Sequence, residues 1–195
     1  IMLGLKLATD PRWVNIAEKS LEDILTDHAY CEQKAATSGI SIIIKYPEKE
    51  DVVEEMTSLV AEEWGHFRKV LKELKKRGLK LGNQRKDDYV IELKKLERKN
   101  LNDRNLILVE HLLINGMIEA RSCERFRLLS LHISDPELKN FYHEFMVSEA
   151  GHYRTFLDLA KKYADPDYVK QRWSEILDAE AQILSQMEYR GDRVH

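Results

Sequence analysis

Two ten-residue stretches, 62–71 and 148–157, repeat one pattern of charged and apolar residues and constrain the fold more than any other feature. They read EEWGHFRKVL and SEAGHYRTFL, and each contains a glutamate followed three positions later by a histidine. These residues are Glu63 and His66 in the first copy and Glu149 and His152 in the second. A repeat that served only a hydrophobic core would preserve apolar positions, so the retained carboxylate and imidazole indicate a shared chemical task.

Both Glu/His pairs fall on the apolar side of a predicted helix, because residues three apart on a helix project from the same side. The first pair shares its side with Val52, Met56, Leu59, Phe67, Val70 and Leu74. The second shares its side with Leu138, Tyr142, Phe145, Tyr153 and Phe156. A carboxylate buried among such residues is costly unless it is ion-paired or bound to a metal. Core salt bridges are the alternative, but neutral histidines do not neutralise two glutamates, so the repeat favours a metal site.

The repeat also predicts one further carboxylate on each remaining long helix. Glu32 lies 31 residues before Glu63 on an apolar face, and Glu119 lies 30 residues before Glu149. Glu124 is the alternative to Glu119, since it too has apolar neighbours, but its spacing breaks the repeat. We therefore predict six metal ligands through which catalysis proceeds: Glu32, Glu63, His66, Glu119, Glu149 and His152.

Four carboxylates and two imidazoles form a donor set typical of iron or manganese. Zinc prefers fewer ligands, and calcium does not favour histidine. Two divalent ions bridged by Glu63 and Glu149 would balance the charge of the four carboxylates. The sequence therefore predicts a centre of two iron ions, with manganese as the alternative ion.

Helical structure is favoured throughout the 195 residues, because proline (4) and glycine (8) are scarce and no useful period-two pattern occurs. Caps and prolines predict helices over about 10–19, 20–45, 48–77, 87–99, 101–133, 135–163 and 165–187. Four of these are long, which predicts an all-α four-helix bundle with additional short helices and a C-terminal helix. We expect one domain over 1–195, with its core in about 20–163 and a frayed tail from residue 188.

Other side chains near the predicted ligands have both a functional and a structural interpretation. His28, one turn before Glu32, either orients that ligand or is a satisfied core histidine. Cys123 is more consistent with a small core residue than with a pocket lining. Four arginines either pair with carboxylates or are solvated, with pairing favoured for the first two: Arg68, Arg154, Arg121 and Arg125. Three aromatic residues are predicted to lie in the core: Trp64, Phe126 and Tyr153.

Basic residues gather over 69–86 and again over 94–99. The formal net charge of the chain is −3, which alone does not indicate a nucleic-acid binder. A solvated helix face is therefore the default interpretation of these clusters, and contact with phosphates is the functional one.

The ligand pattern resembles that of the ferritin-like di-iron carboxylate superfamily over about residues 20–163. Storage ferritins usually lack the second histidine, and the chain has no C-x-x-C pairs for the rubredoxin domain of rubrerythrins. Ala36 stands where ribonucleotide reductase small subunits carry a radical-bearing tyrosine. Four segments resemble the bacterial tRNA 2-methylthio-isopentenyl-adenosine hydroxylases: DHAYCEQKAA (27–36), AEEWGHF (61–67), IEARSCERF (118–126) and SEAGHYRTF (148–156).

This resemblance implies a tRNA-modifying di-iron monooxygenase that hydroxylates the isopentenyl group of the modified adenosine beside the anticodon. It implies O2 as co-substrate, the tRNA anticodon stem-loop as partner, and a separate reductase, because the chain shows no flavin, nicotinamide or iron–sulfur motif. Two cysteines and the lack of a leader or long apolar run lead us to expect a cytoplasmic protein without membrane contact. The oligomeric state is left open.

Three alternative functions use a similar ligand set. A di-iron hydroxylase of a lipid quinone should carry a strongly apolar, membrane-facing helix, which the sequence lacks. Iron storage or detoxification would require assembly into a large shell. A manganese catalase would fit the ligands, and metal analysis would separate it from an iron enzyme.

Overall fold

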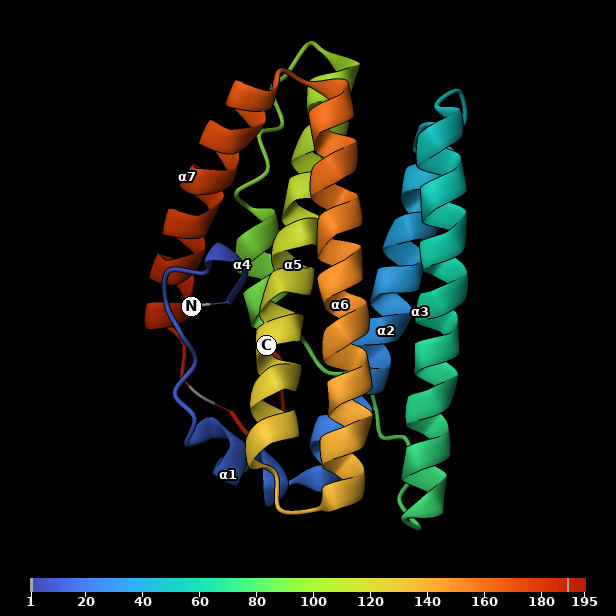
Figure 1. Ribbon diagram of the computed structural model, residues 1–195, viewed down its shortest axis with the longest axis vertical. Coiled ribbons are helices and arrows are strands. Elements are labelled where there is room, and N and C mark those ends of the chain that lie inside the picture. Colours follow the sequence, from blue (N-terminus) through green and yellow to red (C-terminus); the bar gives the residue numbers. More distant parts are fainter. Residues whose placement is uncertain (1, 189) are drawn as a thin grey trace. The chain divides into compact units, whose positions relative to one another are not determined.

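A computed structural model of the chain describes residues 2–188 and 190–195. Within these residues the structure is all-α and contains no strand, which confirms the predicted fold class. Along the chain lie η1 (Met2–Gly4), α1 (Trp13–Glu18), α2 (Leu21–Lys45), α3 (Glu50–Lys76), α4 (Asp88–Lys94), α5 (Arg104–His132), α6 (Pro136–Tyr163) and α7 (Pro166–Ser185) (Figure 1). Each predicted helix is present, and the largest difference is at α4, which ends at Lys94 instead of near Lys99.

Aspartate side chains fix where three of the helices begin. Asp103, Asp135 and Asp165 each accept hydrogen bonds from two backbone N–H groups in the first turn of α5, α6 and α7. Pro136 and Pro166 follow two of these caps, where the fixed φ of proline suits a first helical turn. Ser20, predicted to cap α2, precedes that helix without a capping bond from its side chain.

The chain divides into two compact units. The α2/α3 unit comprises residues 15–86 and 190–194, and the α5/α6 unit comprises residues 1–14, 87–189 and 195. Each unit contains one pair of the four long helices. The expectation of a single domain over residues 1–195 stays a prediction.

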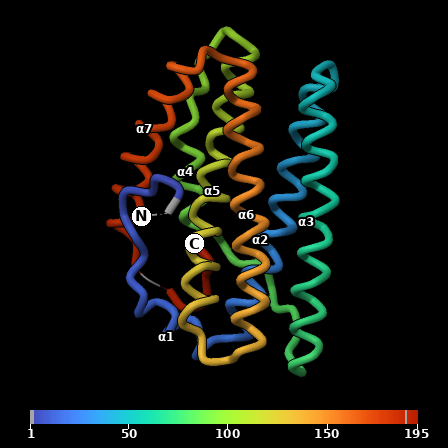
Figure 2. Tube along the Cα trace, in the orientation of Figure 1, coloured from blue at the N-terminus to red at the C-terminus, as the bar shows by residue number. Residues whose placement is uncertain are grey.

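In the α2/α3 unit, the two long helices lie side by side (Figures 1 and 2). The buried side of α3 repeats at intervals of three and four residues: Val52, Met56, Leu59, Glu63, Phe67, Val70 and Leu74. Gly39 of α2 faces this helix, and a Cβ atom there would lie 2.6 Å from Cγ2 of Val60. Glycine at this position therefore permits the close approach of α2 to α3, which holds Glu32 and Glu63 on facing sides.

In the α5/α6 unit, α5 and α6 lie side by side, and α5 also contacts α4, α7 and η1. Because neighbours cover it from several directions, α5 buries nearly every residue between Leu108 and Leu129. An aromatic cluster joins the two long helices, with ring centroids 5.7 Å apart for Phe126 and Tyr142 and also for Phe126 and Phe145. The packing of this unit therefore surrounds the buried charged residues of α5 and α6.

The C-terminal residues are ordered against the α2/α3 unit, so the prediction of a frayed tail is wrong. Val194 is fully buried, and its backbone N–H donates to Oδ2 of Asp27 at 2.8 Å. Asp192 accepts a hydrogen bond from Arg85 at 2.7 Å. These partners lie far away in the sequence, so local composition gave no sign of them. Tyr189, also in the predicted tail, lies outside the described residues.

Candidate metal centre

The α2/α3 unit brings three of the predicted ligands together. Nδ1 of His66 lies 3.3 Å from Oε2 of Glu63, one turn away on α3, and 3.4 Å from Oε2 of Glu32 on α2. Ligand atoms of the three residues all lie within 4.8 Å of one another. Glu63 is fully buried, Glu32 is buried, and His66 is partly buried. The unit therefore presents two carboxylates and one imidazole to a common point.

His28 is the side chain that holds Glu32. Its Nε2 atom lies 2.6 Å from Oε1 of Glu32, one turn along α2, and His28 is fully buried. Of the two interpretations left open for His28, this contact supports the one in which it orients the carboxylate. The other oxygen of Glu32 faces His66, so the two histidines lie on opposite oxygens of one carboxylate.

The pKa of His66 reflects its two carboxylate neighbours. Burial by itself lowers this pKa, but hydrogen bonds with Glu32 and Glu63, followed by their negative charges, raise it from 6.5 to about 10. In the absence of a cation the imidazole is therefore protonated at neutral pH. A divalent ion would replace that proton as the positive charge between the carboxylates.

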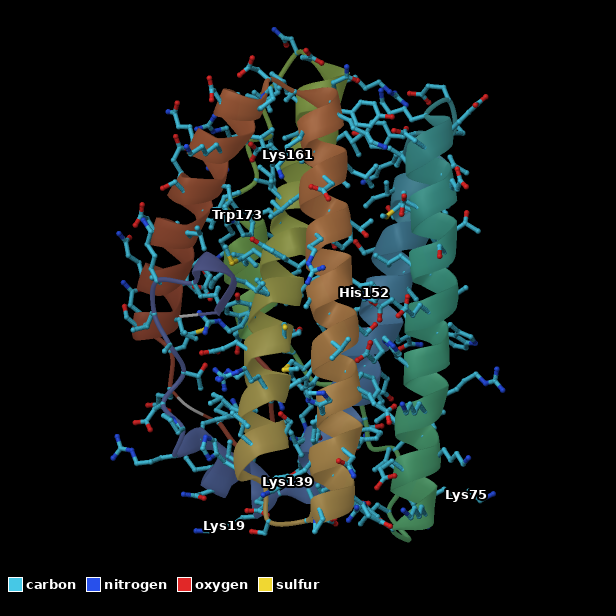
Figure 3. All side chains as sticks on the ribbon, in the orientation of Figure 1. Lys19, Lys75, Lys139, His152, Lys161 and Trp173 are labelled. Carbon is cyan, nitrogen blue, oxygen red and sulfur yellow. The ribbon has the colours of Figure 1, made fainter. Side chains whose placement is uncertain are left out.

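The α5/α6 unit brings the other three predicted ligands together. Nδ1 of His152, midway along α6 (Figure 3), lies 3.5 Å from Oε2 of Glu149, one turn away. Glu119 of α5 joins them, and ligand atoms of the three residues lie within 4.8 Å of one another. All three residues are buried. The arrangement repeats that of Glu32, Glu63 and His66, with one carboxylate from the first helix and a Glu/His pair from the second.

Glu124, the alternative to Glu119, has a different task. Its Oε1 accepts from the backbone N–H of Thr9, and its Oε2 accepts from Nη1 of Arg121, both at 2.7 Å. Arg121 is fully buried and also donates to Glu180 at 2.9 and 3.0 Å. Tyr89 donates to the same Glu180 at 3.0 Å. Glu124 therefore balances a buried arginine, which leaves Glu119 as the carboxylate beside Glu149.

Cys123, one turn after Glu119, is buried and donates its Sγ–H to the carbonyl oxygen of Met146 at 3.2 Å. Burial, followed by the charges of Glu149 and Glu124, raises the pKa of this thiol to about 12. A neutral thiol is a poor metal ligand. The prediction that Cys123 fills space in the core is consistent with this environment.

The remaining side chains named from the sequence divide into confirmed and wrong predictions. Phe126 is buried, as predicted, whereas Tyr153 is only partly buried against Trp173. Trp64 is 47% exposed, so its prediction as a core residue is wrong. Arg125 is buried over the ring of Trp13, with 4.4 Å between its guanidinium carbon and the ring centroid. Two further arginines, for which pairing was favoured over solvation, are both exposed: Arg68 and Arg154.

Each of the two ligand groups contains a donor set that suits iron or manganese, because it offers hard carboxylate oxygens and one imidazole nitrogen. Among residues 2–188 and 190–195, no helix has the length and hydropathy needed to span a bilayer. The helical architecture and these ligands define the class of the protein as ferritin-like, with the carboxylate and histidine residues of a non-haem oxygenase.

Comparison with known families identifies the particular family within this class. The family model described as tRNA-(MS[2]IO[6]A)-hydroxylase (MiaE) matches residues 2–195, so the chain belongs to this family. A protein from Pseudomonas putida KT2440 named tRNA 2-(methylsulfanyl)-N(6)-isopentenyladenosine(37) hydroxylase is 36% identical over 176 residues, covering 90% of this chain and 84% of that protein. A protein of the same name from Salmonella typhimurium LT2 is 26% identical over 212 aligned positions, covering 84% of this chain and 77% of that protein.

A solved structure shares the fold over nearly the whole chain. It is described as protein 43 with aldehyde deformylating oxygenase activity from Synechococcus, and it is 30% identical with a TM-score of 0.90. The match covers 98% of this chain and 94% of that one. The similarity therefore supports an oxygenase. The activity named for the Synechococcus protein, aldehyde deformylation, differs from the tRNA hydroxylation named for the two relatives.

Proposed function

We propose that this protein is an O2-dependent, tRNA-modifying hydroxylase that acts on the isopentenyl group of 2-methylthio-isopentenyl-adenosine beside the anticodon. The family match over residues 2–195 and the names of the two relatives support this reaction. The observation that carries the proposal is the duplicated ligand group, in which a Glu/His pair on one helix meets a carboxylate on its neighbour.

We propose that the two groups act as halves of one two-iron centre. Each ligand group would contribute two carboxylates and one imidazole to holding the ions. Four negative charges would balance two divalent cations, which accounts for keeping four carboxylates in buried positions. The complete ligand set is Glu32, Glu63, His66, Glu119, Glu149 and His152.

When bound, a pair of ferrous ions supplies the activation of O2 for insertion of one oxygen atom into a C–H bond, while two electrons and two protons convert the other to water. Residues of the chain orient the proposed ligands for this chemistry. His28 holds Glu32 through one oxygen and leaves the other directed towards His66. His66 would hold an ion through its neutral imidazole, so the proton that it carries without a metal would be released.

Burial of the proposed ligands excludes water, and the neutral state of a neighbouring thiol protects that thiol from oxidation. Glu63, Glu119, Glu149 and His152 are buried, and the raised pKa of Cys123 keeps this thiol neutral. We propose that electrons arrive from a separate reductase and that the protein acts in the cytoplasm, where tRNA is modified. Manganese is the alternative ion for the same donor set.

The metal part of the proposal is tested by counting iron. The parent protein should bind two iron ions per chain after anaerobic loading, and Glu63→Ala and His152→Ala should each lose this stoichiometry. The residue Glu144, a glutamate of α6 outside both ligand groups, provides the matched control as Glu144→Ala. Two bound irons in either ligand variant would overturn the ligand set.

The reaction is tested on tRNA from a strain that lacks the gene. Digestion and mass spectrometry should show the hydroxylated nucleoside only when the active gene is restored. An unchanged nucleoside profile would overturn the tRNA assignment. The same purified protein, supplied with an aldehyde and a reducing system, should yield no alkane or formate; their release at comparable turnover would favour the activity named for the Synechococcus protein. A particle of many subunits in scattering would favour iron storage.

A further inference from the structure

The outward side of α3 combines an exposed tryptophan with a row of basic residues. Trp64, Arg68, Lys72 and Lys75 recur at intervals of four, four and three along the helix, so they share one side. All four are exposed, and Lys75 projects outward from the end of α3 in Figure 3. We call these four residues the α3 outer row. Glu63 and His66 belong to a different side of the same helix.

The charge of α3 changes sign along its length. Residues 50–63 contain six acidic and no basic side chains, whereas residues 64–76 contain five basic and one acidic. The one acidic residue of the second part, Glu73, is hydrogen-bonded to Arg77 at 2.6 Å. Favourable interaction with the helix dipole accounts for lysines in the last turn, but Arg68 and Lys69 lie two turns earlier. The second half of α3 is therefore a concentrated positive surface.

Trp64 lies where this positive surface begins. Its ring stacks on Phe67, with centroids 4.9 Å apart and an interplanar angle of 26°, yet 47% of the residue remains exposed. A large aromatic residue supported on one side and accessible to solvent is suited to stacking against a planar ligand. Scattered surface lysines of a solvated helix would not require such a residue.

The residue after the tryptophan, Gly65, leaves open space beside the ring. A Cβ atom at this position would have no other atom within 4 Å, so packing inside the protein does not call for glycine. Glycine in a helix interior costs about 1 kcal/mol relative to alanine. No side chain of the protein therefore obstructs a molecule that approaches the helix beside Trp64.

We propose that the α3 outer row binds the anticodon region of the substrate tRNA, with Arg68, Lys72 and Lys75 contacting phosphates and Trp64 stacking on an unpaired base. This inference rests on the proposed function, because it assigns a surface to the same substrate. Single-stranded RNA combines the two features that the surface complements, since exposed bases stack on aromatic rings and the backbone carries one negative charge per nucleotide. The row holds the nucleotides around the reacting adenosine and does not touch the ligands of the metals.

The test uses iron-loaded protein and tRNA that carries the unhydroxylated nucleoside. The triple variant Arg68→Gln/Lys72→Gln/Lys75→Gln should bind this tRNA about 30-fold more weakly, and the slope of log K against log salt should fall by about 2. Trp64→Ala should weaken binding about tenfold, and Trp64→Phe should restore most of the loss. Under turnover, both weakened variants should raise KM while kcat stays within about twofold of the parent.

A charge-matched control removes three exposed lysines from α6 and α7, as Lys161→Gln/Lys162→Gln/Lys170→Gln. This variant should bind tRNA within about twofold of the parent. Equal losses in the two triple variants, or parent-like binding in the α3 variants, would overturn the proposed surface. Failure of the parent to hydroxylate tRNA at all would instead overturn the proposed function, so the two failures are distinguishable.

Discussion

Nε2 of His28 lies 2.6 Å from Oε1 of Glu32 inside the α2/α3 unit, while the second oxygen of that glutamate faces His66 at 3.4 Å. The carboxylate is thus fixed on one side by a buried residue that is not itself a proposed ligand. Hydrogen bonds of this kind orient ligands and contribute to metal affinity.

His28→Ala should therefore weaken iron binding by about 10- to 100-fold, because Glu32 would lose the contact that orients it. His28→Gln should recover part of the affinity, since its amide can donate to the same oxygen. Competition with a chelator of known affinity measures the change, and circular dichroism confirms that the variants are folded. Parent-like affinity in a folded His28→Ala protein would show that the contact is dispensable.

Glu119 and Glu124 should respond to substitution in opposite ways. Glu119→Gln should lose bound iron with little change in the stability of the metal-free protein. Glu124→Ala should retain two irons but lose about 3 kcal/mol of stability, because it leaves buried Arg121 with one carboxylate fewer. Denaturant unfolding and metal analysis on both variants check this, and iron loss in Glu124→Ala alone would reverse the assignment of the ligand.

The stability of metal-free protein should fall as the pH rises from about 6.5 towards 10. Hydrogen bonds with Glu32 and Glu63 raise the pKa of His66 to about 10, although burial opposes them. A raised pKa means that the folded state binds the proton more tightly, so the stabilisation is complete below pH 6.5 and is lost as pH approaches 10. Urea unfolding across this range measures the effect, and His66→Gln should flatten the profile. Equal slopes in the two proteins would contradict the assignment.

Two glycines provide opposite tests of packing. Gly191→Ala should destabilise the protein by about 1–3 kcal/mol, because the new Cβ would lie 2.5 Å from the carbonyl oxygen of Ile16. Gly151→Ala should instead stabilise it by about 1 kcal/mol, because that helical position has open space around it. Thermal unfolding compares the two, and a neutral Gly191→Ala would show that the C-terminal segment is not held as described.

Much of the helical structure follows from the sequence because its causes are local. Asp103, Asp135 and Asp165 cap helices within two or three residues of themselves, and the three- and four-residue spacing of apolar side chains marks the buried side of α3. The ligand groups were predictable for the same reason. A glutamate and a histidine three residues apart lie on the same side of any helix. The repetition of this pair therefore indicated the candidate metal ligands.

What the sequence alone determined, then, is the succession of helices and the candidate ligands, since both depend on neighbours within a few turns. Only the tertiary structure decided that Glu124 accepts a hydrogen bond from Arg121, that Trp64 is exposed to solvent, and that the backbone N–H of Val194 donates to Asp27. The last of these contacts joins residues separated by 167 positions. Burial and ion pairing depend on which segments pack against one another. The periodicity of a single helix does not indicate this, because it depends only on residues within a few turns.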